Sequence, residues 1–327
     1  MPEAIFQVEK LKKDFQRGKR VVHALSDVSF TLYQGETLSL VGESGCGKTS
    51  CARTLLGVYE PTGGRILWKG KDITALSHRE RVVFHRENQM IFQDPYASLD
   101  PRMTVAMSIE EGMKRHFSLS PKERQKRTEH LLEAVGLTAE FASRFPHELS
   151  GGQRQRVGIA RALALEPEFL ACDEPIAALD VSIQAQIINL LMRLQRERGL
   201  TYLMISHDLT VVRHISDRVA VMYLGSIVEL ADSDALYGQP LHPYTQALLT
   251  AVPQADPDSN WLQNIVPLPG EASDSAHLTV GCRFAPRCPH ATEKCRSEAP
   301  PLLDRGGGHL AACWENEIQG KGVFMQV

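Results

Sequence analysis

Residues 42–49, with the sequence GESGCGKT, combine glycines, a lysine and a hydroxyl at a spacing that suits phosphate binding. The glycines let successive backbone N–H groups curl around phosphate oxygens, Lys48 would reach the β- and γ-phosphates, and the Thr49 hydroxyl would bind Mg²⁺. The apolar run TLSLV precedes the motif and a helix is expected from Lys48, which is the context that the motif requires. An ordinary glycine-rich turn is the alternative. The candidate nucleotide contacts here are Gly42, Glu43, Ser44, Gly45, Cys46, Gly47, Lys48, Thr49 and Ser50.

A pair of carboxylates, Asp173 and Glu174, follows the apolar run FLAC. Because side chains alternate along a strand, the two carboxylates are expected to point different ways and to do different jobs. Asp173 is placed to hold Mg²⁺ through its waters, and Glu174 is placed to polarise a water molecule that attacks the terminal phosphate. Taken alone, the pair could be a strand end that closes in a solvated acidic turn.

Two further polar residues follow apolar runs, Gln93 after QMIF and His207 after LMIS. The Gln93 amide could contact both Mg²⁺ and the attacking water, and a plain turn residue is the alternative. His207 is expected to reach the γ-phosphate, although a single histidine at a strand end is more often structural than catalytic.

A second candidate anion site lies at LSGGQRQR, residues 149–156. Ser150 can cap a helix that begins here, while Gly151 and Gly152 leave the backbone open to a ligand. The positive end of the helix dipole favours negative charge. No lysine is nearby, so the chain holds two phosphate cradles about a hundred residues apart, and the second lacks a cation of its own.

Short apolar runs alternate with longer helical patterns through the first 235 residues, which is typical of an α/β fold. We expect buried strands at TLSLVG, QMIF, EFLAC, TYLMIS and RVAVMYLG, and helices over residues 122–135, 153–165 and 181–198. The mostly helical stretch between Gln93 and Leu149 interrupts this alternation. It is interpreted as an inserted helical subdomain at approximately residues 94–150.

The composition changes near Tyr237. Residues 236–327 hold 10 of the 18 prolines, 4 of the 7 cysteines and 9 acidic against 6 basic residues, whereas the first 235 residues carry 30 of each sign. We therefore expect one domain over residues 1–236 and a Pro/Cys-rich C-terminal extension over residues 237–327. The expected fold class is α/β, with a P-loop NTPase (RecA-like) core that carries the inserted helical subdomain and this extension.

The overall charge and hydropathy exclude some classes of protein. A net charge of −3, from 36 basic and 39 acidic residues, argues against a nucleic-acid binder, which usually has a basic surplus. The chain has no apolar run long enough to span a bilayer, and its start, MPEAIFQVEK, lacks the basic and apolar segments of a secretory signal. We expect a cytosolic protein that reaches a membrane only through a partner.

The motifs occur in the order found in ABC transporter ATPases: the phosphate loop, Gln93, LSGGQ, CDEP, the ALD of residues 178–180, and His207. Over residues 5–235 the chain resembles that family, to which LSGGQ is highly specific. The resemblance implies that ATP and Mg²⁺ are bound and that two ATPase domains pair head to tail. The LSGGQ of one domain then caps the ATP held by the other, which explains a second cradle without a lysine.

The resemblance also assigns individual residues. Phe15 matches the aromatic residue that stacks on adenine, where Tyr is more common, and Ala177 stands where relatives commonly have Ser. Hydrolysis is assigned to Lys48, Gln93, Glu174 and His207; Mg²⁺ binding to Thr49, Gln93 and Asp173; and contacts to the partner's ATP to Ser150, Gly151, Gly152, Gln153 and Asp180.

Two stretches, LHPYTQALL at residues 241–249 and QDPYASLDPRMTV at residues 93–105, resemble the ATPases of oligopeptide and dipeptide importers. That group takes up peptides, opines and nickel complexes. The likeness implies a paralogous second ATPase subunit in a heterodimer, two transmembrane permease subunits and an extracytoplasmic solute-binding protein, with no nucleic acid. The chain would be a peripheral protein at the cytoplasmic face of the cell membrane. Ordinary helix and loop packing is the alternative for both stretches.

Four cysteines of the extension, Cys282, Cys288, Cys295 and Cys313, are spaced as C-x5-C-x6-C-x17-C. Nothing indicates an oxidising compartment, so thiolate ligands are expected rather than disulfides. Zinc sites more typically show C-x2-C pairs. The resemblance implies a 4Fe-4S cluster, which four thiolates suit. Zinc and unligated thiols are the alternatives, and Cys46, Cys51 and Cys172 receive no ligand role.

Two other functional classes share part of this motif set. A soluble ABC ATPase that acts on DNA or ribosomes usually has two cassettes in one chain, a long coiled coil or basic arms, and the sequence has none of them. A P-loop phosphotransferase would have no use for LSGGQ. The motif set therefore favours the transporter ATPase.

Overall fold

The computed structural model describes residues 3–18, 20–177, 179–252 and 280–315, and the chain divides into two compact units. The first comprises Met1–Ile5, Leu32–Thr37 and Trp68–Ser206, and the second comprises Phe6–Thr31, Leu38–Leu67 and His207–Val327. The proline-rich residues 253–269 lie outside the described residues. Among the described residues, no helix is long and apolar enough to cross a membrane.

The centre of the first unit is a parallel sheet with the strand order β8-β7-β6. β6 is Asn88–Ile91, β7 is Phe169–Asp173 and β8 is Thr201–Ile205. Ala171 of β7 lies opposite Met90 on one side and Leu203 on the other. Every residue of β7 and β8 is buried, which explains why these strands are continuous apolar runs rather than alternating ones. The sequence predicted all three strands.

Helix α6, Val181–Arg198, follows β7 and has the bounds that its periodicity predicted. Ile187, Leu190, Leu191 and Leu194 form its buried face, at the spacing of an amphipathic helix. Gly199 ends the helix with φ +66°, a left-handed conformation that glycine adopts without strain. A glycine directly after the helical pattern therefore marks the C-terminal end of this helix.

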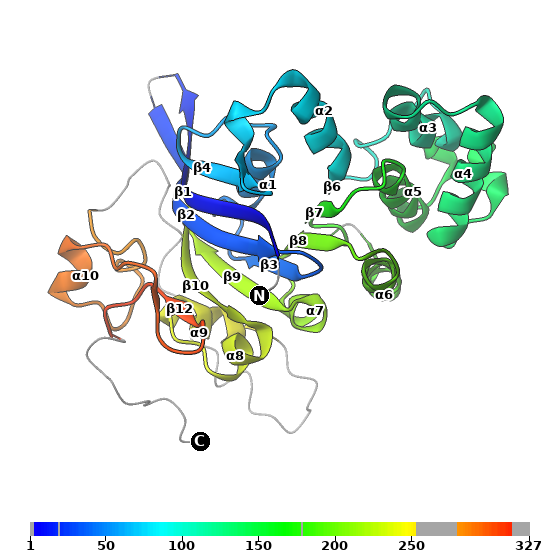
Figure 1. Ribbon diagram of the computed structural model, residues 1–327. Coiled ribbons are helices and arrows are strands. Elements are labelled where there is room, and N and C mark those ends of the chain that lie inside the picture. Colours follow the sequence, from blue (N-terminus) through cyan, green and yellow to red (C-terminus); the bar gives the residue numbers. More distant parts are fainter. Residues whose placement is uncertain (1–2, 19, 178, 253–279, 316–327) are drawn as a thin grey trace, which may run out of the picture. The chain divides into compact units, whose positions relative to one another are not determined.

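Three helices between β6 and β7 pack against one another: α3 (Val105–His116), α4 (Pro121–Ala134) and α5 (Gly151–Leu163). They form the green group in Figure 1, with the short 3₁₀ turns η2 (Ala139–Ser143) and η3 (Pro146–Glu148). Ser120 begins α4 with a capping box to Glu123, and Pro121 occupies the first turn, where its missing N–H costs no hydrogen bond. Each of the two predicted helices in this stretch lies within two residues of its expected bounds, whereas the periodicity analysis did not predict α3.

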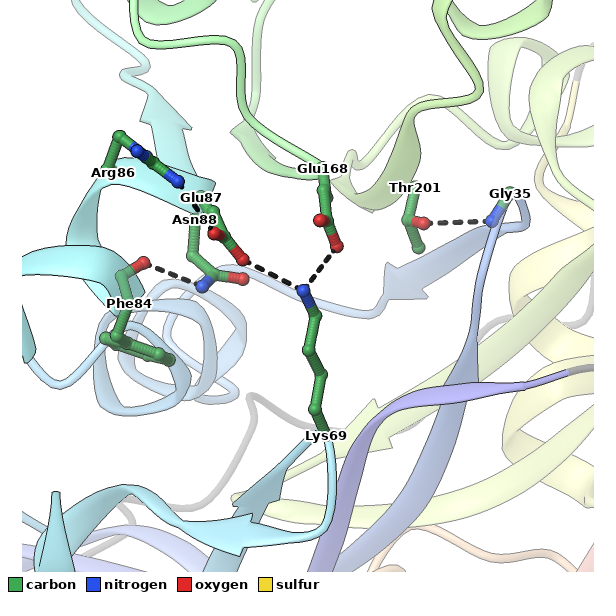
Figure 2. A network of polar contacts seen from close by, with 8 residues as sticks. All are labelled: Gly35, Lys69, Phe84, Arg86, Glu87, Asn88, Glu168 and Thr201. Carbon is green, nitrogen blue, oxygen red and sulfur yellow. Dashed lines mark hydrogen bonds and ion pairs between the residues drawn. The ribbon is translucent and has the colours of Figure 1, made fainter. Parts of the chain in front are cut away.

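Lys69 connects three segments of the first unit (Figure 2). Its Nζ lies 2.8 Å from Glu87 Oε2, at the end of α2 (His78–Glu87), and 2.7 Å from Glu168 Oε2, just before β7. Partial burial opposes the charged ammonium, but the hydrogen bonds to Glu168 and Glu87 outweigh it and raise the pKa of Lys69. At the same end of the sheet, where Thr201 begins β8 beside Glu168, the Gly35 N–H donates to Thr201 Oγ1 at 2.9 Å. β5 (Lys71–Asp72) and the turn η1 (Ile73–Ala75) precede α2.

The described residues of the second unit contribute strands to two sheets. In one, β2 (Arg20–Tyr33), β1 (Ala4–Arg17) and β4 (Gly63–Trp68) are neighbours in that order. In the other, β3 (Thr37–Val41) is parallel to β9 (Arg218–Tyr223), and β9 is antiparallel to β10 (Ser226–Asp232). Its helices are α1 (Lys48–Leu55), α7 (Leu209–Ile215), α8 (Ser233–Gly238), α9 (Pro243–Thr250) and α10 (Glu293–Ser297).

Two short strands near the end of the described residues pair with this second sheet. β12 (Leu310–Ala311) pairs antiparallel with β10, and β11 (Leu303–Asp304) pairs with β12. Tyr244 and Phe284 pack into the same apolar cluster as Val219 and Tyr223 of β9. Helix α8 runs through Tyr237, the residue at which the composition changes. Residues on both sides of the compositional change therefore share one hydrophobic core.

Candidate nucleotide-binding site

The phosphate loop connects β3 to α1 in the second unit. At two of its positions, Gly42 and Gly47, no residue with a side chain fits without moving the backbone. Gly42 has φ +143°, and a Cβ there would lie 2.2 Å from the Met222 carbonyl oxygen. Gly47 has φ +106°, and a Cβ there would lie 2.4 Å from the Ala24 carbonyl oxygen. Both contacts are with backbone atoms, so the neighbours cannot move aside by changing a rotamer. The loop is therefore shaped by its close approach to two other segments of backbone.

Lys48 folds back into the loop that precedes it. Its side chain is buried, and Nζ donates to the carbonyl oxygens of Gly42 at 2.7 Å and Glu43 at 2.9 Å. The ammonium group is thus held inside the loop at the start of α1, where backbone N–H groups and the helix dipole also favour an anion. This arrangement presents a concentrated positive potential suited to a polyphosphate.

The three cysteines outside the C-terminal region, Cys46, Cys51 and Cys172, are all buried. Burial raises the pKa of the Cys46 thiol and raises that of Cys51 to about 12. Burial also raises the pKa of Cys172 in β7. All three thiols therefore stay protonated near neutral pH.

The two carboxylates at the end of β7 occupy different environments. Asp173 is the last strand residue and is 1% exposed, whereas Glu174 lies beyond the strand with φ +45°. A left-handed conformation is uncommon for glutamate and is held here by a hydrogen bond from the Glu174 N–H to the Ile205 carbonyl at 3.0 Å. Gln93 Nε2 donates to Glu174 Oε2 at 2.8 Å. The tertiary structure therefore brings Gln93 and Glu174 into direct contact.

The LSGGQ segment forms the first turn of α5. Ser150 Oγ accepts from the Gln153 N–H at 3.3 Å, and Gln153 Oε1 accepts from the Ser150 N–H at 2.9 Å, which is a capping box. A Cβ at Gly152 would lie 2.7 Å from Ile183 Cγ2 of α6. The glycine therefore allows close packing between the two helices as well as an open backbone. Asp180 begins α6 as its N-cap residue.

The remaining predicted contacts lie in the second unit. Phe15 is half-buried on β1, with its ring 5.1 Å from that of Tyr59 in an edge-to-face arrangement and Lys13 Nζ 5.0 Å from its centroid. Tyr59, the aromatic neighbour of Phe15, was not predicted from the sequence because it belongs to no recognised motif. His207 is exposed and follows β8 in sequence, with Ser206 between them. Gln93, Asp173, Glu174, Ser150, Gly151, Gly152, Gln153 and Asp180 belong to the first unit, while Phe15, His207 and the phosphate loop belong to the second.

Sequence reasoning also missed two residues that contact the phosphate loop from the C-terminal region. The Glu43 N–H donates to Tyr244 Oη at 2.9 Å, and Arg287 pairs with the Glu43 carboxylate at 2.9 Å. Tyr244 belongs to the HPYT stretch and Arg287 to the cysteine-containing turn. More than 200 residues separate each of them from Glu43, so no local pattern indicates these contacts.

The four cysteines of the C-terminal region line one cavity of about 160 Å³. Burial raises the pKa of Cys282, and raises that of Cys288 to about 11 with smaller contributions from the three other thiols. Within the described residues, however, no three His, Cys, Asp or Glu side chains are grouped closely enough to hold a metal ion. The expectation of an iron–sulfur cluster is therefore not confirmed.

Comparison with known proteins identifies the family. A family model described as ABC transporter matches residues 25–177, and one described as oligopeptide/dipeptide transporter, C-terminal region, matches residues 228–295. The putative oligopeptide transport ATP-binding protein YkfD of Bacillus subtilis (strain 168) is 51% identical over 311 residues, 94% of this chain and 94% of its own. AppF of the same strain, an oligopeptide transport ATP-binding protein, is 50% identical over 319 residues, 95% of this chain and 97% of its own. The chain belongs to the ABC transporter family.

Solved ABC transporter structures resemble the chain as well. The dimeric structure of MJ0796, a bacterial ABC transporter cassette, has a TM-score of 0.65 and 29% identity, and covers 70% of this chain and 98% of that one. A dimeric post-hydrolysis state of MJ0796 bound to ADP and Pi has a TM-score of 0.64 at 29% identity, with the same coverage. The P-loop NTPase fold of an ABC cassette is therefore confirmed, and the chain is an ABC-type ATPase. The C-terminal family match begins at residue 228, within β10.

Proposed function

We propose that this ABC ATPase couples the binding and hydrolysis of MgATP to the import of di- or oligopeptides across the cytoplasmic membrane. The observation that carries the proposal is the match of residues 228–295 to the C-terminal region of oligopeptide and dipeptide transporters. This region contains most of β10, which pairs with β9 in the ATPase sheet, and it contacts the phosphate loop through Tyr244. Near full-length likeness to proteins named oligopeptide transport ATP-binding proteins supports the same substrate class.

We infer that the chain is organised as two domains. Residues 1–236 form the ATPase domain, with α3, α4 and α5 as the inserted helical subdomain at approximately residues 94–150. Residues 237–327 form the C-terminal extension. We infer that two permease subunits, an extracytoplasmic solute-binding protein and a paralogous second ATPase subunit complete the transporter. The chain would then lie at the cytoplasmic face of the membrane as a peripheral subunit.

Binding and hydrolysis are divided among the residues of the site. The loop from Gly42 to Ser50 wraps the phosphates, and Lys48 neutralises the β- and γ-phosphates. Phe15 offers a face to adenine. Thr49, Gln93 and Asp173 would hold Mg²⁺, which neutralises charge on the phosphate oxygens. Asp173 suits this role because it is a buried carboxylate at a strand end.

Glu174 is placed to act as the general base. Its carboxylate accepts a hydrogen bond from Gln93, which orients it and offers a second polar group to the attacking water. His207 would contact the γ-phosphate. Ser150, Gly151, Gly152, Gln153 and Asp180 would contact ATP held by the partner ATPase subunit. The Ser150 hydroxyl accepts from Gln153 and still has its proton to donate to a phosphate oxygen.

The experiment is reconstitution of this chain with the membrane subunits and solute-binding protein encoded beside it. We expect the subunits to co-purify, and peptide-loaded binding protein to stimulate ATP hydrolysis and peptide uptake into vesicles. Lys48→Ala should abolish both activities. Stimulation by a nickel complex or an opine, but not by peptides, would assign the chain to another substrate of the same family. A chain that co-purifies with no membrane subunit would contradict the proposal.

The candidate site for the 4Fe-4S cluster that the family resemblance implies is the cysteine cavity. The four thiols surround this cavity, which is lined in part by Phe284 and Trp314. We propose that Cys282, Cys288, Cys295 and Cys313 hold the cluster, which would supply a one-electron redox centre.

Metal analysis of the full chain, purified without oxygen, tests this assignment. We expect iron and acid-labile sulfide in equal amounts, and their loss when Cys288 and Cys295 are both replaced by serine. The matched control, Cys51→Ser, should retain them. Stoichiometric zinc without iron, or no metal, would contradict the cluster.

A further inference from the structure

The turn that carries Cys282 and Cys288 also reaches the phosphate loop, through Arg287. Arg287 is 7% exposed, and its guanidinium makes a two-pronged ion pair with Glu43. Nη1 lies 2.9 Å and 3.1 Å from the two carboxylate oxygens, and Nη2 lies 3.1 Å from Oε1. Such forked pairs are among the strongest and most directional charged hydrogen bonds. The C-terminal region therefore fixes the second residue of the phosphate loop.

Glu43 is held on three sides. Its side chain pairs with Arg287, its N–H donates to Tyr244 Oη at 2.9 Å, and its carbonyl accepts from Lys48 Nζ at 2.9 Å. Tyr244 is fully buried, and burial raises the pKa of its hydroxyl, which therefore stays neutral and available as an acceptor. The Glu43 backbone is thus positioned from the C-terminal region and from the lysine that is proposed to bind phosphate.

The Arg287 guanidinium lies against an aromatic cluster. The Arg287 guanidinium carbon lies 5.9 Å from the centroid of the Tyr223 ring, and Nη1 lies 3.4 Å from the Tyr223 hydroxyl. The Tyr223 ring in turn packs edge-to-face against Tyr244, with centroids 4.7 Å apart. Because these rings belong to the buried core of the second unit, the guanidinium has little freedom to leave Glu43.

The ion pair between Arg287 and Glu43 changes the charge that the phosphate loop presents to a nucleotide. Glu43 belongs to the loop that is proposed to wrap a polyphosphate, and an unpaired carboxylate there would repel the anion. Arg287 cancels that charge and holds the carboxylate toward the C-terminal region. The Arg287 side chain is 8% exposed and the Glu43 side chain is 30% exposed, so the pair is half-buried. Removing Arg287 alone would leave the Glu43 charge uncompensated.

We propose that Arg287 is a positioning residue for ATP binding, which neutralises and orients Glu43 so that the phosphate loop accepts a triphosphate. This inference rests on the proposed ATP site and gives the C-terminal region a direct part in it. Arg287 acts through Glu43, so its removal should weaken nucleotide affinity far more than it slows the chemical step.

The test measures MgATP affinity by calorimetry, and KM and kcat for hydrolysis, on the full-length chain. Arg287→Gln should weaken MgATP binding roughly tenfold and raise KM to match, while kcat changes less than about twofold. Arg296→Gln removes an exposed arginine from the same region and is the matched control, with no expected change. The double variant Glu43→Gln/Arg287→Gln removes both charges and should recover most of the lost affinity.

Each result of these affinity measurements either supports or contradicts the proposed role of Arg287. Wild-type affinity in Arg287→Gln would overturn the inference, and the ATP binding of the wild type would still support the proposed function. A double variant as weak as Arg287→Gln would also overturn it, because the loss would then come from a disturbed C-terminal region and not from the unpaired carboxylate. If the wild type binds no MgATP, the proposed function itself fails.

Discussion

The side-chain amide of Gln93 lies 2.8 Å from the carboxylate of Glu174, although 81 residues separate them in the sequence. Gln93 follows β6 and Glu174 follows β7, and these two strands are parallel neighbours. Parallel strands end at the same edge of a sheet, so residues that follow them meet. The contact joins Glu174, the proposed general base, to the Gln93 amide, which can help to orient the water molecule that attacks the γ-phosphate.

Replacing Glu174 with Gln should separate ATP binding from hydrolysis. The amide keeps the shape of the side chain and its backbone conformation but cannot accept a proton, so we expect hydrolysis to fall at least about a hundredfold while MgATP stays bound. Phosphate release and the nucleotide retained after gel filtration measure the two effects. Hydrolysis at the wild-type rate would show that Glu174 is not the base.

Replacing Gly152 with Ala should disturb the junction between α5 and α6. The new Cβ would lie 2.7 Å from Ile183 Cγ2, and Ile183 is β-branched, so we expect unfolding free energy to fall by about 1–2 kcal/mol together with ATP hydrolysis. Chemical denaturation and phosphate release measure these changes.

A matched control for this change lies in the same helix. A Cβ at Gly158 would meet no described heavy atom within 4 Å outside α5, so Gly158→Ala should be neutral or stabilising. The pair Gly152→Ala/Ile183→Ala removes the close contact and should recover hydrolysis. Equal stabilities for Gly152→Ala and Gly158→Ala would contradict the packing role of Gly152.

His242 should make the folded state less stable in acid. It is 1% exposed, its Nδ1 accepts from the Tyr244 N–H at 3.1 Å, and burial lowers its pKa from 6.5 to about 4 in spite of the opposing effect of Glu229. Between these two values the unfolded chain binds more protons, so stability is complete above about pH 6.5 and falls toward pH 4. The corresponding loss is at most about 3 kcal/mol.

Urea unfolding at pH 7 and pH 5 measures this effect. Asn at position 242 can cap α9 through its side-chain oxygen and does not titrate in this range, so His242→Asn should lose less stability in acid than the wild type does. Glu229 and His309, which pair at 2.7 Å beside His242, are present in both proteins and cancel in the comparison. Equal pH dependence of the two proteins would show that His242 is not the group responsible.

The amino-acid sequence by itself determined the local chemistry and the elements that carry it. Apolar runs located β3, β6, β7, β8 and β9, helical spacing located α4, α5 and α6, and residue spacing located the phosphate loop and the carboxylate pair. These features depend on neighbours within a few residues, where periodicity and backbone chemistry act directly. Strands β1 and β2 went unpredicted.

Only the tertiary structure decided which distant residues meet. The pairing of Gln93 with Glu174, the packing of Gly152 against Ile183 and the ion pair between Arg287 and Glu43 each join segments far apart in the sequence. One arginine among many in a sequence carries no mark of its partner. It gains a specific partner when a sheet and a buried aromatic cluster fix the guanidinium within hydrogen-bonding reach of one carboxylate.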